Sequence, residues 1–367
     1  MSVNTEFWRG RSVLVVGHSG FKGGWISTWL TMVGAKVSGY ALAPEGKDNM
    51  FEAISLSDHL VSNDFADITD IEALRRTLQK TQPEVIFHLT AVSWVGRAYA
   101  NPAGTFMTNV MGTVNLLEAV RSSESVKAVV VITSDKCYEI DPSTMEYSEA
   151  DRLGGYDPYA SSKACVEILT ASWRRSWFSD TENEMDIQSH SAGIATARAG
   201  NVIGGGDWAG GRLVPDMVRA KYAGADFNVR YPDSIRPWQH VLEPVAGYIQ
   251  LAQNLLKNKS EFDEAWNFGP NIESCKSVRH VVEGLSRNFS MQFDLESGDS
   301  SNVLHETKIL RLNIEKAKSR LNWQPVFTLE QALNETTNWY DSYYSGGNMF
   351  EITLSQIKDY QKAAKMI

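Results

Sequence analysis

The amino-acid sequence predicts an α/β protein built on a doubly wound parallel sheet, with a smaller second region toward the C-terminus. Three observations support this prediction. Short apolar runs alternate with helical patterns through the first 200 residues, which is the rhythm of successive β-α-β units. A glycine-rich turn follows the first apolar run, where such sheets pass from strand to helix. The 367 residues and 43% apolar content are enough for one large α/β domain and an added lobe.

The alternation can be followed along the chain. Apolar runs typical of buried strands cover residues 12–16, 36–42, 84–90, 126–133 and 193–200, and a third strand region precedes residues 65–70. Helical patterns lie between them at 25–34, 71–80 and 105–120, and a long helix begins at about Pro158. After residue 200 glycine and proline become denser, and helical patterns return only at 241–256 and 328–344. We therefore expect a first domain over 1–200 with return segments near 236–265, a second region over 201–345, and a polar C-terminal tail over 346–367.

Composition and charge exclude several classes of partner. The net charge of -9 and the lack of a long basic run argue against binding nucleic acid or an anionic membrane. Cys137, Cys165 and Cys275 lack CxxC spacing, which argues against a disulfide framework or a zinc site, and we predict no metal. The N-terminal apolar core of about five residues is too short for a signal peptide, and no run approaches the roughly 20 apolar residues of a membrane span. The sequence therefore predicts a soluble, cytoplasmic protein.

The glycine-rich turn is the first feature that predicts a ligand. The string "GHSGFKGG" places Gly17, Gly20 and Gly23 between the first apolar run and the first helical pattern. Glycines at such a junction let the backbone turn tightly and approach a pyrophosphate, whose charge then lies at the helix N-terminus. Lys22 adds positive charge. The motif predicts a dinucleotide-binding Rossmann domain over residues 1–200, and the alternative is a glycine-rich turn without a ligand.

The choice between NAD and NADP rests on the end of the second predicted strand. The acidic residue that usually binds the adenosine ribose is missing, because "SGYALAPEG" contains none before Glu45. No arginine stands there to hold a 2′-phosphate either, so NAD is favoured. Further on, Asp67 and Ile68 are candidates for a hydrogen bond and an apolar contact to the adenine. The alternative is that Asp67 or Thr69 caps the next helix.

A tyrosine and a lysine on the long predicted helix indicate acid-base chemistry. Tyr159 and Lys163 stand four residues apart, so their side chains leave the same face of the helix. An ammonium beside a phenol lowers the pKa of the phenol, which makes the tyrosine a base near neutral pH. Ser134 stands at the end of an apolar run, where a strand opens toward the cofactor crevice. Alone, a tyrosine-lysine pair is usually a surface feature, but these three residues and the glycine turn form a set that oxidises an alcohol.

Several longer strings resemble one family. They are "GHSGFKGGW", "TSDKCYE", "GGYDPYASSK", "RAGNVIGGGDW", "IRPWQHVLEP" and "AWNFGP", and they extend from about Gly17 to about Tyr344. Together they resemble the extended short-chain dehydrogenase/reductase superfamily and, within it, the nucleotide-sugar 4,6-dehydratases. The strings "TSDKCY" and "RPWQHV" are most similar to the branch that acts on CDP-linked glucose.

The resemblance implies an NAD-dependent hydro-lyase with five catalytic residues. Tyr159 would take the proton of the C4 hydroxyl, Ser134 would hydrogen-bond the same oxygen, and Lys163 would bind the nicotinamide ribose. Asp135 would protonate the departing C6 hydroxyl, and Lys136 would act on the C5 proton. Hydride return to C6 would then give a 4-keto-6-deoxy sugar, with a CDP-hexose as the favoured substrate. Out of this context, an Asp-Lys pair is a solvated turn, and a lysine base requires burial or a neighbouring cation that lowers its pKa.

The resemblance also implies contacts to cofactor and substrate. Further cofactor contacts would come from Ser19, Phe21, Leu89 and Ala91. Substrate contacts would come from Asn201, Arg212, Arg236, His240 and Asn267. The arginines suit a diphosphate, because a guanidinium offers a planar fork of donors to phosphate oxygens. For each substrate residue, a structural role is the alternative.

One segment departs from the family. Relatives read close to "HLAAQPLVR" after the fourth strand, whereas this chain has "HLTAVSWVGR", with Val92, Ser93 and Gly96 at changed positions. Because this segment lies beside the nicotinamide and the sugar in the family, a different hexose or nucleotide stays open.

Two other functions compete with the dehydratase. A sugar-nucleotide 4-epimerase shares Tyr159 and Lys163 but does not need Asp135 and Lys136. A catalytically inactive dinucleotide-binding regulatory protein would not need an intact catalytic set. Relatives are commonly dimers, so a homodimer or a dimer of dimers is expected, built on the long helix and the helix near residues 107–119.

Overall fold

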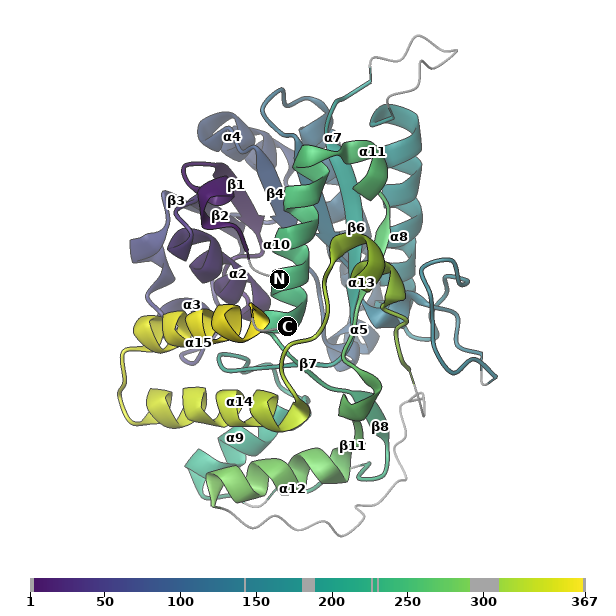
Figure 1. Ribbon diagram of the computed structural model, residues 1–367. Helices are drawn as coiled ribbons and strands as arrows, with labels where there is room; N and C mark the ends of the chain where they lie inside the picture. Colours follow the sequence, from purple (N-terminus) through teal and green to yellow (C-terminus); the bar gives the residue numbers. More distant parts are fainter. Residues whose placement is uncertain are drawn as a thin grey trace.

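The computed structural model describes residues 3–141, 143–179, 189–225, 227–229, 231–290 and 310–365. Its centre is a parallel sheet of seven strands in the order β3-β2-β1-β4-β5-β6-β10 (Figure 1). The strands are β1 (Ser12–Val16), β2 (Lys36–Ala41), β3 (Ser62–Phe65), β4 (Val85–His88), β5 (Ala128–Ile132), β6 (Gly193–Ala199) and β10 (Ala265–Phe268). The predicted doubly wound parallel sheet is confirmed.

Helices cover both faces of the sheet. In β1, Val13 and Val15 belong to one core cluster, and Leu14 and Val16 belong to the other, because alternate side chains face opposite sides. The first cluster includes residues of α2 (Phe21–Met32) and α10 (Leu242–Lys257), and the second includes residues of α4 (Ile71–Thr81), α7 (Gly112–Arg121) and α8 (Pro158–Trp177). A parallel strand buried on both faces requires apolar residues at every position, which explains the unbroken run of valines in β5.

The strand order places a crevice between β1 and β4. The chain continues from β1 to β2 and β3 on one side, whereas β4, β5, β6 and β10 lie on the other side. Ligands of doubly wound proteins bind at such a reversal, beyond the carboxyl ends of the strands. Gly17 follows β1 there, and Leu89 follows β4 with its backbone N–H donating to the Val16 carbonyl at 2.7 Å. The sheet therefore brings these two candidate cofactor residues together.

The second region lies below the carboxyl edge of the sheet in Figure 1. Its helices are α9 (Leu213–Ala223), α12 (Val278–Phe289) and α14 (Leu329–Tyr344). It also contains two small strand pairs, which are antiparallel β8 (Ile235–Pro237) with β11 (Cys275–Ser277) and parallel β7 (Val202–Ile203) with β9 (Gln239–His240). The chain returns to the main sheet with α10 and β10, close to the return segment expected near 236–265. The segment expected as a tail contains a further helix, α15 (Met349–Ala364).

Shorter segments complete the described chain. They are α1 (Thr5–Trp8), α3 (Met50–Ala53), η1 (Leu56–His59), α5 (Val95–Ala100), α6 (Pro102–Phe106), η2 (Met107–Met111), η3 (Asp135–Cys137), α11 (Lys259–Phe262), η4 (Ile272–Ser274) and α13 (Glu315–Leu321). The helix predicted over 105–120 is interrupted, because η2 is π-helical and separates α6 from α7. All three cysteines are free, as predicted. Among the described residues, no helix is both long and apolar enough to cross a membrane.

Helix α15 is fixed to the body of the protein by a buried carboxylate. Glu243 of α10 accepts hydrogen bonds from the backbone N–H groups of Val326 and Phe327 and, at 2.7 Å, from the Tyr360 hydroxyl of α15. The Tyr360 ring also packs edge-on against Trp29 of α2. Burial raises the pKa of Glu243 from 4.5 to about 7. The expected tail is therefore part of the packed structure.

Stability should depend on pH through Glu243. Because its pKa is higher in the folded protein, the stabilisation is full below about pH 4.5 and is lost as pH rises through about 7. A rise of this size corresponds to about 3 kcal/mol. In Glu243→Gln the amide can accept from the backbone and donate to Tyr360. The free energy of unfolding of this variant, measured with urea, should therefore rise by about this amount relative to that of wild type between pH 5 and pH 8. Exposed Glu351→Gln is the control, and equal pH dependence of wild type and Glu243→Gln would contradict the assignment.

Candidate active site

The glycine turn after β1 is shaped by backbone contacts. Gly17 has a φ of +103°, which favours glycine, and a Cβ atom on it would lie 2.7 Å from the backbone nitrogen of Thr90. A Cβ atom on Gly23 would lie 2.0 Å from the Gly17 carbonyl oxygen, so only glycine lets α2 pack this closely on the turn. Gly20 caps α2 without a side-chain hydrogen bond, which leaves the first N–H groups of the helix available to an anion. The turn fits a pyrophosphate.

Lys22 brings a positive charge into the site from the first turn of α2. Burial lowers the pKa of Lys22 to about 8, and the charge of Arg212 acts in the same direction. The carboxylates of Asp135 and Asp207 oppose this shift. The pKa of Lys22 therefore responds to the charge of Asp135, which follows β5, and to the charges of Asp207 and Arg212 in the second region. Beside it, Ser19 donates to the Leu42 carbonyl at 2.9 Å and joins the turn to the end of β2.

The residues proposed for the adenine lie after β3. Asp67 accepts hydrogen bonds at 2.9 Å from both the backbone N–H and the hydroxyl of Thr69. The cap of α4 is Asp70, so the alternative that Asp67 or Thr69 caps this helix is wrong. Ile68 is buried and would contact any Cβ atom placed on Gly112 of α7, so its side chain packs in the core. Asp67 is exposed and stays the candidate for a polar contact to the adenine.

The turn after β5 carries the serine, the acid and the lysine. Ser134 accepts from the Lys136 backbone N–H at 3.2 Å and donates to Asp135 at 2.9 Å, so its hydroxyl organises the short helix η3. Asp135 is buried, with Gly200 behind it, where a Cβ atom would lie 3.0 Å from its carboxylate. Burial raises the pKa of Asp135, although the charges of Lys136 and Lys22 and the bond from Ser134 oppose the shift. The carboxyl group therefore keeps a proton closer to neutral pH than an exposed aspartate does.

Helix α8 brings Tyr159 and Lys163 against the same turn. The helix begins at Pro158 after an Asp157 cap whose carboxylate accepts from the Ala160 backbone N–H. Lys163 donates to the Ile132 carbonyl at the end of β5 at 3.0 Å, and Tyr159 hydrogen-bonds with Ser134. Tyr159 therefore meets Ser134, and Lys163 contacts the backbone two residues before Ser134.

The pKa of Tyr159 differs from the sequence prediction. Burial raises the pKa of Tyr159 to about 12, although the bond with Ser134 and the charge of Arg212 act in the opposite direction. The predicted lowering of the Tyr159 pKa is therefore wrong for this structure, because burial outweighs the contributions that lower it. The Lys163 ammonium donates to the Ile132 carbonyl instead. Burial, aided by the charge of Lys22, lowers the pKa of Lys163 to about 8. Desolvation thus favours the neutral form of both groups.

The five candidate substrate residues divide into accessible and internal groups. Arg212 precedes α9, where it donates to Asp207 at 2.8 Å and to Ser93 at 2.9 Å. Asn201 is half-buried after β6, and Arg236 in β8 is buried with one nitrogen donating to the Ile235 carbonyl.

The other two substrate candidates have no exposed surface. His240 lies between the rings of Trp25 and Phe327. The Asn267 side chain donates to the Tyr147 and Asn313 carbonyls and accepts from the Tyr138 hydroxyl. These contacts favour the structural role for both residues.

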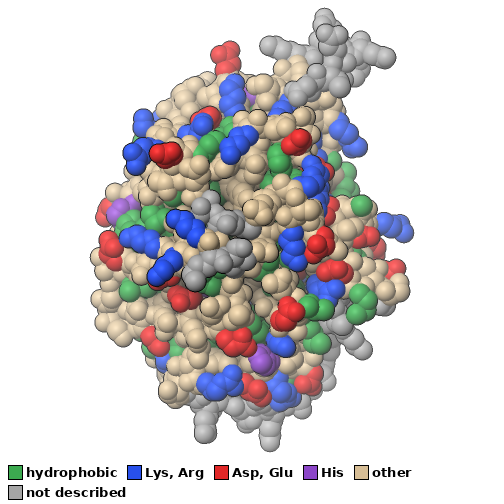
Figure 2. Space-filling view, viewed as in Figure 1, with side chains coloured by type: hydrophobic (Ala, Val, Ile, Leu, Met, Phe, Trp, Pro, Cys, Tyr) green, Lys and Arg blue, Asp and Glu red, His purple; other side chains and the backbone are tan. Residues whose placement is uncertain are grey.

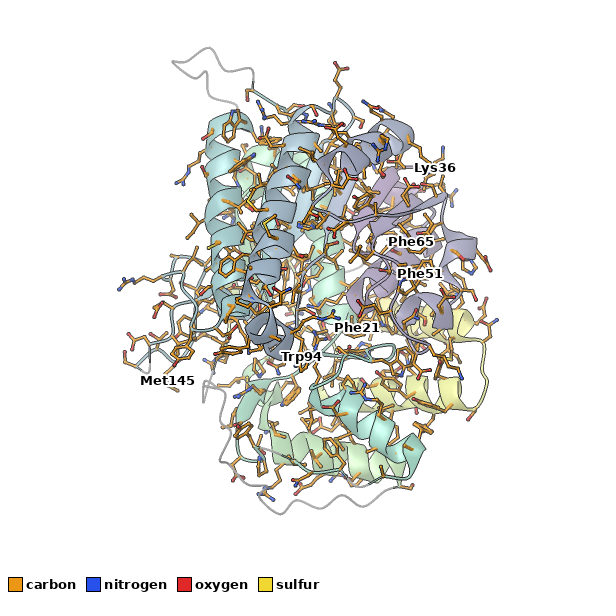
Figure 3. The ribbon with its side chains drawn as sticks, turned by 180° about the vertical axis from the view of Figure 1, so that it is seen from behind. Phe21, Lys36, Phe51, Phe65, Trp94 and Met145 are labelled. Carbon is orange, nitrogen blue, oxygen red and sulfur yellow. The ribbon has the colours of Figure 1, made fainter. Side chains whose placement is uncertain are left out.

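The segment that departs from the family contacts the second region. Trp94 is 43% exposed, and its indole fills a slot in which a Cβ atom on Gly96 or on Gly211 would lie within 2.6 Å of the ring. Figure 3 shows Trp94 and Phe21 at the same level of the molecule, where the sheet meets the second region. Together with the Ser93–Arg212 bond, the indole joins the loop after β4 to the loop before α9. The two glycines are the sequence signal for this contact, but their pairing depends on the fold.

The fold and the site define a dinucleotide-binding protein of the short-chain dehydrogenase/reductase class. The chain belongs to the GDP-mannose 4,6 dehydratase family, whose profile matches residues 14–336. It is 42% identical to a CDP-glucose 4,6-dehydratase of Salmonella typhimurium over 98% of this chain and 99% of that protein. It is 25% identical to a dTDP-glucose 4,6-dehydratase of Haemophilus influenzae over 75% of this chain and 81% of the relative.

Solved structures with the same fold include dehydratases and epimerases. A dTDP-glucose 4,6-dehydratase from Bacillus anthracis in complex with NAD matches with a TM-score of 0.74 and 23% identity, over 93% of this chain and all of that one. A UDP-glucose 4-epimerase from Thermotoga maritima with UDP-glucose matches with a TM-score of 0.75 and 20% identity, over 90% and 99% of the two chains. At these identities the likeness extends to the fold.

Two glycines of the turn should respond differently to the same substitution. Gly23→Ala should lower thermal stability, because the new methyl group collides with the Gly17 backbone. Gly20→Ala should fold normally, since its Cβ would lie 3.5 Å from the nearest atom, but should weaken NAD binding by blocking close approach of the pyrophosphate. Thermal melts and titration with NAD would measure both effects. Wild-type NAD affinity in a folded Gly20→Ala protein would contradict this assignment.

Proposed function

We propose that this protein is an NAD-dependent dehydratase that converts CDP-D-glucose to CDP-4-dehydro-6-deoxy-D-glucose and water. The observation that carries the proposal is the position of Asp135 and Lys136, which follow Ser134 directly on the turn that faces Tyr159. An alcohol dehydrogenase needs the serine, tyrosine and lysine, but elimination of water also needs an acid and a base beside them. The 42% identity to a CDP-glucose 4,6-dehydratase supports the nucleotide and the sugar.

The residues at the switch point fit NAD. The glycine turn and the N-terminus of α2 would hold the pyrophosphate, with Ser19, Phe21 and Lys22 beside it. Leu89 and Ala91 would line the nicotinamide side, and Asp67 would contact the adenine. When bound, NAD would supply the hydride acceptor for oxidation at C4 and the hydride donor for reduction at C6.

The chain's own residues would then move the protons. Tyr159 takes the proton of the C4 hydroxyl in its phenolate form, which burial opposes and which the hydrogen bond with Ser134 and the charge of Arg212 favour. Ser134 donates a hydrogen bond to the same oxygen, and Lys163 binds the ribose. The resulting ketone acidifies the hydrogen at C5. Asp135, whose pKa is raised by burial, protonates the C6 hydroxyl as it leaves. Lys136, half-buried on the same turn, acts on the C5 proton.

The substrate diphosphate would bind between the two regions. Arg212 is the leading candidate, because its guanidinium is held at the junction by Asp207 and Ser93 and can turn its fork of donors to a diphosphate. Asn201 and Arg236 are further candidates. The exposed indole of Trp94 adds an apolar wall that is larger than the leucine of the family pattern at this place.

The test is a panel of nucleotide sugars. CDP-glucose should lose one water and give a 4-keto product by mass spectrometry, and dTDP-, UDP- and GDP-glucose should react more slowly. Tyr159→Phe should abolish turnover, and Asp135→Asn should accumulate reduced cofactor in a single turnover because oxidation proceeds while elimination stalls. Interconversion of C4 epimers without loss of water would instead establish the 4-epimerase. Binding of NAD without any reaction of the panel would favour a regulatory protein.

We also propose that the protein forms a homodimer through α8 and η2. Met107 is 51% exposed and Ile168 is 56% exposed, on segments that pack together at the back of the molecule (Figure 3). Elsewhere, acidic and basic side chains intermingle on the face shown in Figure 2. A dimer of dimers and the cytoplasmic location predicted from the sequence stay predictions.

Charge on α8 should disrupt this dimer. Ile168→Glu places a carboxylate in the proposed interface and should shift the protein from dimer to monomer in sedimentation velocity. The control is Ile272→Glu, which changes an equally exposed isoleucine on η4. A monomeric wild type, or the same dimer in both variants, would rule out this interface.

A further inference from the structure

A buried carboxylate links the elements that carry the catalytic residues. Glu167 lies on α8 one helical turn beyond Lys163 and has almost no exposed surface. Its carboxylate accepts hydrogen bonds from Thr133 at the end of β5 and, at 2.7 Å, from Thr196 in β6. Arg198 of β6 donates to the same carboxylate at 2.8 Å. Burial acts to raise the pKa of Glu167, but the charge of Arg198 holds it below its ordinary value, so the carboxylate stays ionised.

The network continues from Arg198 to Tyr138. The second guanidinium nitrogen donates to the Tyr138 hydroxyl at 2.6 Å, and the guanidinium lies 4.9 Å from the centre of the tyrosine ring. The hydroxyl in turn donates to Asn267 of β10 at 2.8 Å. Both Arg198 and Tyr138 are buried, so the chain of contacts crosses the interior from α8 to β10.

These contacts hold the catalytic turn at both of its ends. Thr133 directly precedes Ser134, and Tyr138 directly follows the short helix η3 that contains Asp135 and Lys136. Glu167 fixes the first end to α8, which also carries Lys163. Arg198 and Tyr138 fix the second end to β6 and β10. Glu167, Arg198 and Tyr138 are not among the proposed ligand contacts.

An ion pair buried this deeply needs an explanation other than stability. Removing two charges from water costs several kcal/mol, and a well-packed apolar pair is often equally stable or more stable. Directional hydrogen bonds from the pair to Thr133, Thr196 and Tyr138 do what an apolar pair cannot, since they fix distances and orientations of the groups they join. The position of this network around the catalytic turn therefore indicates a role in geometry.

We propose that Glu167, Arg198 and Tyr138 are positioning residues that hold the Ser134–Lys136 turn in register with Tyr159 and Lys163. This inference rests on the dehydratase function proposed above. The Thr133 end adjoins the groups for oxidation, and the Tyr138 end adjoins the groups for elimination. Loss of the Tyr138 hydroxyl should therefore loosen Asp135 and Lys136 while leaving Ser134, Tyr159 and Lys163 in place.

The test compares two tyrosine-to-phenylalanine variants. Tyr138→Phe keeps the ring under Arg198 but removes the hydroxyl that Arg198 and Asn267 share. Its kcat should fall roughly 10- to 100-fold with an unchanged KM, because small misplacement of reacting groups costs about this much. Reduction of bound cofactor in a single turnover should keep its wild-type rate, so that reduced cofactor accumulates. Amide hydrogen exchange in residues 133–139 should increase.

Tyr147→Phe is the matched control. Its ring packs 5.1 Å from the Tyr138 ring, and its hydroxyl also makes two hydrogen bonds, but both are to the backbone of Asp141. This variant should keep the wild-type kcat and exchange pattern. If the two variants behave alike, or if oxidation and elimination slow equally in Tyr138→Phe, the positioning role is wrong. A wild type that never eliminates water would instead refute the proposed function, whatever the variants do.

Discussion

Burial of ionisable groups at the carboxyl end of β5 is the constraint on which the rest of the site depends. Asp135, Tyr159 and Lys163 all lie there, and burial is the leading cause of the pKa shift of each. Desolvation favours the neutral forms, so the carboxylic acid keeps its proton and the amine releases its proton more readily. For Asp135 and Lys163 this moves the pKa toward neutral pH, whereas it moves the pKa of Tyr159 away from neutral pH. The same burial is unfavourable for folding, so the surrounding structure must supply hydrogen-bond partners to each buried ionisable group.

The parallel sheet supplies that surrounding structure. Because β5 is covered on both faces, its five residues are apolar and the first polar side chains appear only where the strand ends. There the carbonyl of Ile132, the last residue of the strand, accepts a hydrogen bond from Lys163. Arg198 of β6 and Asn267 of β10 hydrogen-bond to Tyr138 in the segment that follows β5. The candidate catalytic side chains are thus confined to one edge of the sheet. The crevice at β1 and β4 brings the candidate cofactor residues to the same edge.

The sequence was sufficient for features that depend on local pattern. The strands, the glycine turn and the i, i+4 spacing of Tyr159 and Lys163 are periodic or adjacent in the chain, and the structure places them as expected. Features that depend on tertiary burial were not predictable. The pKa of Tyr159 is raised because the fold removes water from it, and Glu167 meets Arg198 only because α8 packs on β6. The sequence predicts a polar tail where the structure has α15, because the partners of this helix in α2, α10 and α14 come together only in the fold.

The segment after β4 shows how departures from a family pattern can compensate one another. Ser93 replaces a proline of the relatives and supplies a hydroxyl that accepts from Arg212. The arginine of the family pattern is displaced or replaced by Gly96, where a Cβ atom would collide with the indole of Trp94. The indole in turn requires Gly211, which adjoins Arg212 in the second region. The Ser93 hydroxyl and the Trp94 indole therefore both join the loop after β4 to the loop that carries Gly211 and Arg212. Because these contacts fix the position of the Arg212 guanidinium relative to the loop after β4, a substitution at Ser93 or Trp94 should move the group that we propose for the diphosphate.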